Sequence, residues 1–130
     1  MIMFIDMDGL KIINDNYGHK EGDFAIQRLA EVIRDCCMAN NTCARFGGDE
    51  FLIFGYDMDE DDADELRARF ITKLNEINRI VNKPYQIAAS LGSYITEADE
   101  DTPMFKLITK ADEVMYEEKK RKKTSRYIRH

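Results

Sequence analysis

Two adjacent carboxylates, those of Asp49 and Glu50, directly follow a Gly47-Gly48 step between two short apolar runs. Glycine supplies the positive φ angle that a tight turn needs, so the pattern predicts a β-hairpin from Thr42 to Gly55. Fixed acids at a hairpin tip need a compensating cation or a polar role. A hydrated Mg²⁺ ion, held by a few carboxylates beside substrate phosphates, fits this chemistry.

A second pair of acids follows an apolar run at the start of the chain. The run Met1–Ile5 is short and compatible with a strand, and Asp6 and Asp8 come at its end. The segment that follows, residues 9–23, is dense in Asn, Asp and Gly. We therefore predict a buried strand over about Met1–Asp6 that carries carboxylates at its C-terminal end.

Hydrophobic periodicity predicts helices and strands along the rest of the chain. Proline marks two helix boundaries, one beyond the end of a helix and one near the first turn of another. The expected elements are a short helix at 10–17, a long helix at 23–38, the hairpin at 42–55, a helix approached through acidic residues 57–64 and running from Leu66 to Val81, a strand at 87–95, a helix opening at Thr102-Pro103, and a short strand at Tyr127-Ile128.

The order β-α-β-β-α-β-α predicts an α+β fold, with a ferredoxin-like βαββαβ antiparallel sheet and helices packed on it, similar to the palm of nucleotide cyclases and polymerases. In that topology the first strand runs parallel to the second, and the third strand lies between them. The end of the first strand therefore lies beside the hairpin turn. This placement brings Asp6 and Asp8 near Asp49 and Glu50, which predicts a joint metal site.

Composition limits the class of protein. The 130 residues are enough for one domain with its own core, and no apolar run approaches the roughly 20 residues of a membrane span. The net charge of −6 argues against a general nucleic-acid binder, although metal ions can neutralise the phosphates of a nucleotide substrate. The three cysteines lack the spacing of a metal site, so reduced structural thiols in a cytoplasmic protein are expected, with Cys43 in the core.

Several motifs together resemble one family. The string GGDEF at residues 47–51 has Arg45 ahead of it, and residues 6–23 match the pattern D-x-D-x-x-K-x-x-N-D-x-x-G-H-x-x-G-D at every fixed position. The later segments S-x-G and A-D-x-x-M-Y-x-x-K also match. The chain therefore resembles the GGDEF family, the diguanylate cyclases, over nearly its whole length.

The resemblance implies an enzyme that condenses two GTP molecules into cyclic di-GMP and two pyrophosphates. Each domain would hold one GTP, so a second copy of the domain would face it in a transient homodimer. Mg²⁺ or Mn²⁺ would be the cofactor, the location would be cytoplasmic, and sensory or regulatory domains would be attached in a longer protein. The alternative is a catalytically silent module that binds GTP or a protein partner and regulates its neighbours.

The same resemblance assigns roles to the acids. Asp6 and Asp49 would ligate the metal together with the carbonyl of Met7, and Glu50 would be a further ligand or would assist deprotonation. Asp8 is a weaker candidate for a metal ligand and is otherwise expected to be structural. The alternative is that these are ordinary turn acids, although clustered acids repel one another unless a cation joins them.

The resemblance also assigns the nucleotide contacts. Asn14 and Asp23 would read the guanine base, because a carboxylate accepts hydrogen bonds from the guanine N1–H and N2–H donors. Helix capping is the common alternative use of such residues. Lys11 and Lys119 would approach the triphosphate, and Lys11 would be one of the catalytic residues. The alternative is that both are solvated surface lysines, which is the usual case.

Two segments depart from the family pattern. The common ending A-K-x-x-G-R-N is replaced by residues 118–124, with Lys122 at the usual Gly and Lys123 at the usual Arg. Lysine keeps the charge of arginine but loses its bidentate fork, so Lys123 would bind phosphate more weakly. The basic run would also complement the dipole at a helix C-terminus.

The inhibitory product motif R-x-x-D aligns with Met38-Ala39-Asn40-Asn41, which carries neither charge, so that feedback site is expected to be absent. The family's D-x-L-T-G-L-x-N-R region ahead of the first strand is missing, so we expect residues 1–130 to be a catalytic domain cut from a longer protein. Arg45 is expected to brace the hairpin, and His19 to shape the loop before the long helix rather than act as a base.

Overall fold

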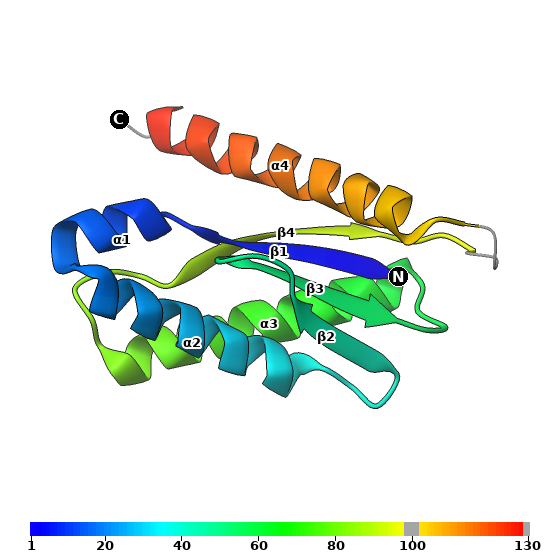
Figure 1. The fold of residues 1–130 in the computed structure, drawn as a ribbon, viewed down its shortest axis with the longest axis horizontal. Coiled ribbons are helices and arrows are strands. Elements are labelled where there is room, and N and C mark those ends of the chain that lie inside the picture. The colour runs from blue at the N-terminus through cyan, green and yellow to red at the C-terminus, as the bar shows by residue number, and fades with distance from the viewer. Residues whose placement is uncertain (98–101, 129–130) are drawn as a thin grey trace.

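A four-stranded antiparallel sheet with the strand order β2-β3-β1-β4 forms the centre of the fold (Figure 1). The computed structural model describes residues 1–97 and 102–128, with side chains as far as Lys122 in the last range. The elements are β1 (Ile2–Asp8), α1 (Leu10–Tyr17), α2 (His19–Cys36), β2 (Asn41–Arg45), β3 (Glu50–Gly55), α3 (Glu60–Val81), β4 (Ala88–Tyr94) and α4 (Met104–Ile128). The predicted α+β, ferredoxin-like fold is confirmed.

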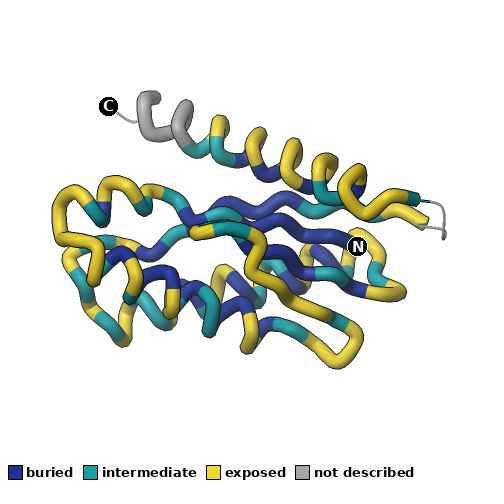
Figure 2. Tube along the Cα trace, viewed as in Figure 1, coloured by how far each residue is buried: buried dark blue, intermediate teal, exposed yellow. Residues whose placement is uncertain are grey.

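Helices cover both faces of the sheet, and β1 shows how the sequence directs this. Successive side chains of a strand point to opposite faces. Ile2 and Phe4 pack in the smaller core cluster with α4, whereas Met3, Ile5 and Met7 pack in the larger cluster with α2 and α3 (Figures 1 and 2). By the same alternation Asp6 and Asp8 lie on the α4 face. None of the helices in the described ranges combines the length and apolar character that crossing a bilayer requires.

Three element boundaries differ from the sequence prediction. Helix α2 begins at His19 rather than Asp23, because Gly18 makes the turn at a φ of 93° and residues 19–22 then continue as helix. Helix α3 begins at Glu60, where Asp59 forms a reciprocal capping box with Asp62. The predicted strand at Tyr127-Ile128 is wrong, because α4 continues through these residues with no Gly or Pro to stop it.

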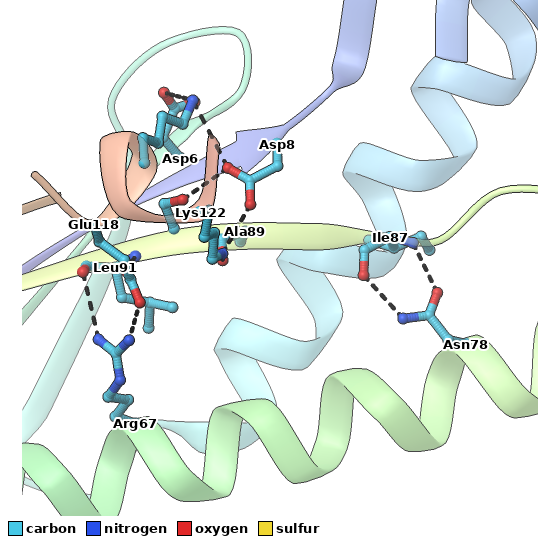
Figure 3. Close-up of polar contacts among 11 residues, drawn as sticks. Asp6, Asp8, Arg67, Asn78, Ile87, Ala89, Leu91, Glu118 and Lys122 are labelled. Atoms are coloured by element: carbon cyan, nitrogen blue, oxygen red, sulfur yellow. Dashed lines mark hydrogen bonds and ion pairs between the residues drawn. The ribbon is translucent and has the colours of Figure 1, made fainter. Parts of the chain in front are cut away.

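The outer edge of β4 is closed by side chains from both faces of the sheet. Glu118 of α4 is buried and accepts a hydrogen bond from the backbone N–H of Leu91. Arg67 of α3 donates to Glu118 and also to the Leu91 carbonyl, at 3.4 Å (Figure 3). An edge strand normally leaves such backbone groups unpaired. The pair Arg67–Glu118 therefore joins helices that lie on opposite faces of the sheet.

Removing the arginine of this pair should destabilise the protein strongly. Arg67→Met leaves the Glu118 carboxylate buried without its counter-ion, which we expect to lower the free energy of unfolding by about 2–3 kcal/mol. The matched control is Lys110→Met, because the Lys110–Glu113 pair is exposed and its atoms are 4.0 Å apart. That substitution should cost no more than ~0.5 kcal/mol. Urea unfolding measures the free energy of unfolding of both variants. Equal losses of this free energy would contradict the importance of the Arg67–Glu118 pair.

Candidate functional site

The hairpin between β2 and β3 docks at the end of β1, as the topology predicted. Asp6 stands opposite Glu50 in the strand register, and the Met7 amide donates to the Asp49 carbonyl at 3.0 Å. Arg45 donates to the carbonyls of the two turn glycines, at 3.1 Å for Gly47. The predicted bracing role of Arg45 is consistent with these contacts. Asp6 is thus brought to one corner of the sheet with Asp49 and Glu50, which lie more than forty residues further along the chain.

Burial and mutual repulsion disfavour the charged forms of two acids at this corner, Asp6 and Glu50. The pKa of Asp6 is raised overall. Burial raises it most, the Lys119 ammonium lowers it, and the charges of Asp49 and Asp8 add to the rise. Burial also raises the pKa of Glu50, with further contributions from Asp6 and Asp49. A divalent cation would relieve this repulsion.

The hydrogen bonding of Asp6 tests whether a metal ion fits among these acids. The Asp6 Oδ1 atom is buried and has no hydrogen-bond partner among the described residues. Carboxylate oxygens are the ligands that Mg²⁺ prefers. Within the described part of the chain no group of three or more His, Cys, Asp or Glu residues is placed to hold a metal ion by itself. The residues therefore fit an open site that water and phosphate oxygens would complete.

Replacing Glu50 by Gln should stabilise the metal-free protein at pH 7. A carboxyl group whose pKa is raised by folding stabilises the fold while it is protonated, and this contribution is lost as the pH rises from the unfolded-state pKa through the folded-state pKa. The pKa of Glu50 lies above its usual value of 4.5. We expect the Tm of Glu50→Gln in EDTA to exceed the wild-type Tm by about 2 °C at pH 7, and the difference to vanish as the pH falls below 4.5.

The control for this measurement is Glu65→Gln, because Glu65 is exposed on α3 away from the acids. It should change Tm little at any pH in the range. A Glu50→Gln protein that is less stable than wild type at pH 7 would show that the Glu50 carboxylate is held by favourable contacts instead of by repulsion.

Two lysines of α4 approach these acids (Figure 3). Lys119 Nζ donates to Asp6 Oδ2 at 2.7 Å, so Lys119 lies beside the acids, and its contact with a triphosphate stays a prediction. Lys122 Nζ donates to Asp8 Oδ2 at 2.9 Å and to the Ala89 carbonyl at 2.6 Å. Ser90 Oγ donates to the other oxygen of Asp8 at 2.8 Å. Both oxygens of Asp8 are therefore engaged, which favours the structural role for Asp8.

From the sequence, Lys122 was expected only to replace the usual glycine within a basic run that complements the helix dipole, so its contact with Asp8 was not predicted. Its i,i+3 spacing from Lys119 was the available signal, because that spacing places both ammonium groups on one face of α4. Lys11 is exposed on the first turn of α1, after Gly9 turns the chain at a φ of 67°. The side chain of Lys123 lies outside the described residues.

The pair assigned to guanine is brought together where α1 meets α2. A Cβ atom at Gly22 would lie 1.8 Å from Asn14 Oδ1, so the Asn14 amide packs directly against the glycine. Asp23 follows on α2 and is exposed. Because α2 begins at His19 with Gly18 as its N-cap, Asp23 is not a helix cap, and Asn14 lies inside α1. The capping alternative for both residues is therefore wrong.

A further group of residues holds this junction in place. Lys83 Nζ and the Tyr85 hydroxyl donate to the two carboxylate oxygens of Glu21, at 2.9 and 2.6 Å. Their hydrogen bonds hold the pKa of Glu21 below its usual value. The ring of Tyr17 of α1 lies against that of Tyr85, with centroids 5.3 Å apart and an interplanar angle of 43°. Sequence reasoning missed this cluster because its partners are more than sixty residues apart and form no local motif.

The expectation that Cys43 lies in the core is wrong, because the residue is exposed. β2 is an edge strand with only β3 as a neighbour, and four of its five residues are exposed (Figure 2). His19 is also exposed, as the first residue of α2.

Comparison with known proteins places this geometry in context. Diguanylate cyclase DgcP of Escherichia coli is 34% identical over 132 residues, which cover 100% of this chain and 38% of that protein. The bifunctional diguanylate cyclase/cyclic di-GMP phosphodiesterase MucR of Pseudomonas aeruginosa is 35% identical over 118 residues, which cover 91% of this chain and 17% of that protein. This chain thus spans well under half the length of these relatives.

Solved structures and a family model agree with these relatives. The active GGEEF domain of a diguanylate cyclase from Vibrio cholerae matches with a TM-score of 0.75 and 25% identity, over 92% of this chain and 76% of that one. The GGDEF domain of DgcB from Caulobacter crescentus, in complex with c-di-GMP, matches with a TM-score of 0.71 and 26% identity, over 92% and 71% of the two chains. The family model described as "Diguanylate cyclase, GGDEF domain" matches residues 1–125. The chain therefore belongs to the GGDEF family.

Proposed function

We propose that this chain is a diguanylate cyclase domain that condenses two GTP into cyclic di-GMP. In each of two identical steps, the 3′-hydroxyl oxygen of one nucleotide attacks the α-phosphorus of the other, the hydroxyl proton is lost, and pyrophosphate leaves. The observation that carries the proposal is the acidic hairpin docked on the end of β1, with the Asp6 Oδ1 oxygen buried and unpaired among the described residues.

The acids would hold the metal. Asp6 and Asp49 would ligate Mg²⁺ or Mn²⁺ with the Met7 carbonyl, and Glu50 would be a further ligand or would take the hydroxyl proton. When bound, the ion would neutralise phosphate charge and favour ionisation of the attacking hydroxyl. Burial and the neighbouring acids raise the pKa of Glu50 above its usual value, which makes its carboxylate a better proton acceptor.

The remaining site residues would bind the nucleotide. Lys119, which is already at Asp6, and Lys11 would contact the triphosphate, with Lys123 adding positive charge. Asn14 and Asp23 would hold the guanine edge, and the packing of Asn14 against Gly22, the residue before Asp23, supports this assignment. GTP is a cytoplasmic nucleotide, so we place the domain in the cytoplasm, within a longer protein whose further domains regulate it.

Because each domain would supply one GTP, the rate should rise more steeply than linearly with protein concentration. Where the protein is verified as monomeric, doubling its concentration should raise the rate about fourfold, since the active species is a pair. The measurement is chromatographic separation of cyclic di-GMP after incubation with GTP and Mg²⁺. Strict proportionality across the dilution range would contradict the paired mechanism.

A second candidate is a silent module that binds GTP without turning it over. The altered basic ending favours it, because Lys122 stands at the family's usual glycine and pairs with Asp8. GTP binding by calorimetry, with no cyclic di-GMP at any protein concentration, would establish this alternative over the enzyme.

A further inference from the structure

Two cysteines meet where α2 gives way to β2. Cys37 is the C-cap residue of α2, with extended backbone, and its half-buried side chain packs against the larger core cluster. Cys43 lies on β2 directly opposite Ile53, which belongs to that same cluster. Residues directly opposite in a sheet share a face, so the Cys43 side chain points to the side on which α2 lies. After burial, the neighbouring Cys43 contributes most to the raised pKa of Cys37, so the two side chains lie close together.

The turn between the two cysteines is fixed by its own hydrogen bonds. The side-chain oxygen Oδ1 of Asn41 accepts a hydrogen bond from the backbone N–H of Met38 at 2.8 Å. The backbone N–H of Asn41 donates to the Met38 carbonyl at 2.9 Å. Asn40 is tied to the Tyr56 carbonyl at 2.8 Å. The proximity of Cys37 and Cys43 is therefore built into the folded chain and needs no ligand.

The three cysteines differ in access to solvent. Cys36 is fully buried, Cys37 is half-buried and Cys43 is exposed. Burial, followed by the neighbouring Cys43, raises the pKa of Cys37 to about 12. Only the Cys43 thiol is freely accessible to a small molecule, so it is the thiol that an external reagent meets first.

We propose that Cys37 and Cys43 form a reversible modification site, a dithiol that a low-molecular-weight disulfide of the glutathione type converts into an intramolecular disulfide. The Cys43 thiolate attacks one sulfur of the reagent, forms a mixed disulfide and releases one thiol. Cys37 then loses its proton, attacks the Cys43 sulfur and releases the second thiol. Two protein thiols are oxidised by two electrons, and the reagent is reduced to two thiols.

Formation of the mixed disulfide helps the second step. Burial makes the largest contribution to the high pKa of Cys37, and the neighbouring Cys43 thiol adds to it. A Cys43 that is bonded to the reagent carries no thiolate charge, so its contribution to the pKa of Cys37 is removed while that of burial remains. The bond would enclose residues 38–42 and join the end of α2 to the strand that leads into the acidic hairpin. The inference is independent of the proposed cyclase activity.

The experiment equilibrates the folded protein with mixtures of glutathione and glutathione disulfide. After acid quenching and unfolding, the free thiols should fall from three to one, and peptide mass mapping should find Cys37 linked to Cys43. Cys37→Ser should stop at a mixed disulfide with glutathione on Cys43. Cys43→Ser should lose both products. Cys36→Ala, checked for folding by circular dichroism, should keep the bridge.

The contrary outcomes are equally distinct. Three free thiols in the most oxidising mixture, a bridge that includes Cys36, or only chain-to-chain disulfides on a non-reducing gel would each overturn the proposal. A Cys37→Ser protein without glutathione on Cys43 would overturn the assigned order of attack. Dithiothreitol should return all three thiols, and failure to do so would rule out a reversible disulfide.

Discussion

Asp49→Ala should abolish formation of cyclic di-GMP from GTP, with a loss of at least ~10³-fold, because it removes a carboxylate from the proposed metal site. The fold should persist. The hairpin is docked through the backbone carbonyl of Asp49, which accepts from Met7, and this bond does not need the side chain. The Asp49 charge also contributes to the raised pKa of Asp6 and Glu50, so its removal relieves repulsion. Thermal unfolding in EDTA should give a Tm equal to or above that of the wild type.

The activity measurement is chromatography of the products at saturating Mg²⁺, with Asp64→Ala as the control. Asp64 is exposed on α3 and touches none of the acids, so its replacement should leave the rate unchanged. A folded Asp49→Ala protein with wild-type turnover would remove Asp49 from the metal site. Loss of activity together with a fall in Tm would show a structural role for the side chain.

Asp23→Ser should relax the preference for GTP over ATP. Guanine offers a donor at N1 where adenine offers an acceptor, so an ionised Asp23 faces a lone pair when adenine binds. A site built around such a hydrogen bond rejects the wrong partner by about 10⁴-fold or more. A serine hydroxyl can donate or accept, so the ratio of affinities should fall to within roughly tenfold.

The structure makes this variant informative. Asp23 is exposed within α2 and caps nothing, so its replacement removes no bond that starts the helix. The matched control is Asp35→Ser, near the other end of α2 and also exposed, which should keep full selectivity. Both proteins are titrated with GTP and with ATP at fixed Mg²⁺. Unchanged selectivity in Asp23→Ser would remove this residue from base recognition.

The sheet and the acidic corner were predictable from sequence because local rules and topology agreed. The continuous apolar run Met1–Ile5 predicted β1, the Gly47-Gly48 step predicted the turn, and the strand order then brought Asp6 to Glu50. The start of α2 was not predictable in this way. Gly18, His19 and Gly22 have the composition of a loop, yet the helix begins directly after Gly18.

The lysine contacts were beyond local reasoning for a different reason. Lys119 and Asp6 are 113 residues apart, and their pairing depends on the angle at which α4 crosses the sheet. No periodicity encodes that angle. Glu118, which stands where the family pattern has alanine, could likewise not be explained from the sequence. Its role is to pair with the backbone at the edge of β4, and the sequence does not show which residues lie at that edge.

The contact between Lys119 and Asp6 has a consequence for how the corner fills with a cation. The ammonium group is tethered to the same chain, so it competes for Asp6 at a fixed effective concentration that dilution of the protein does not reduce. Entry of a divalent ion would therefore exchange one cation for another, and the ion concentration needed would be set partly by the polypeptide itself. The displaced ammonium remains beside the corner, where an arriving triphosphate would meet it.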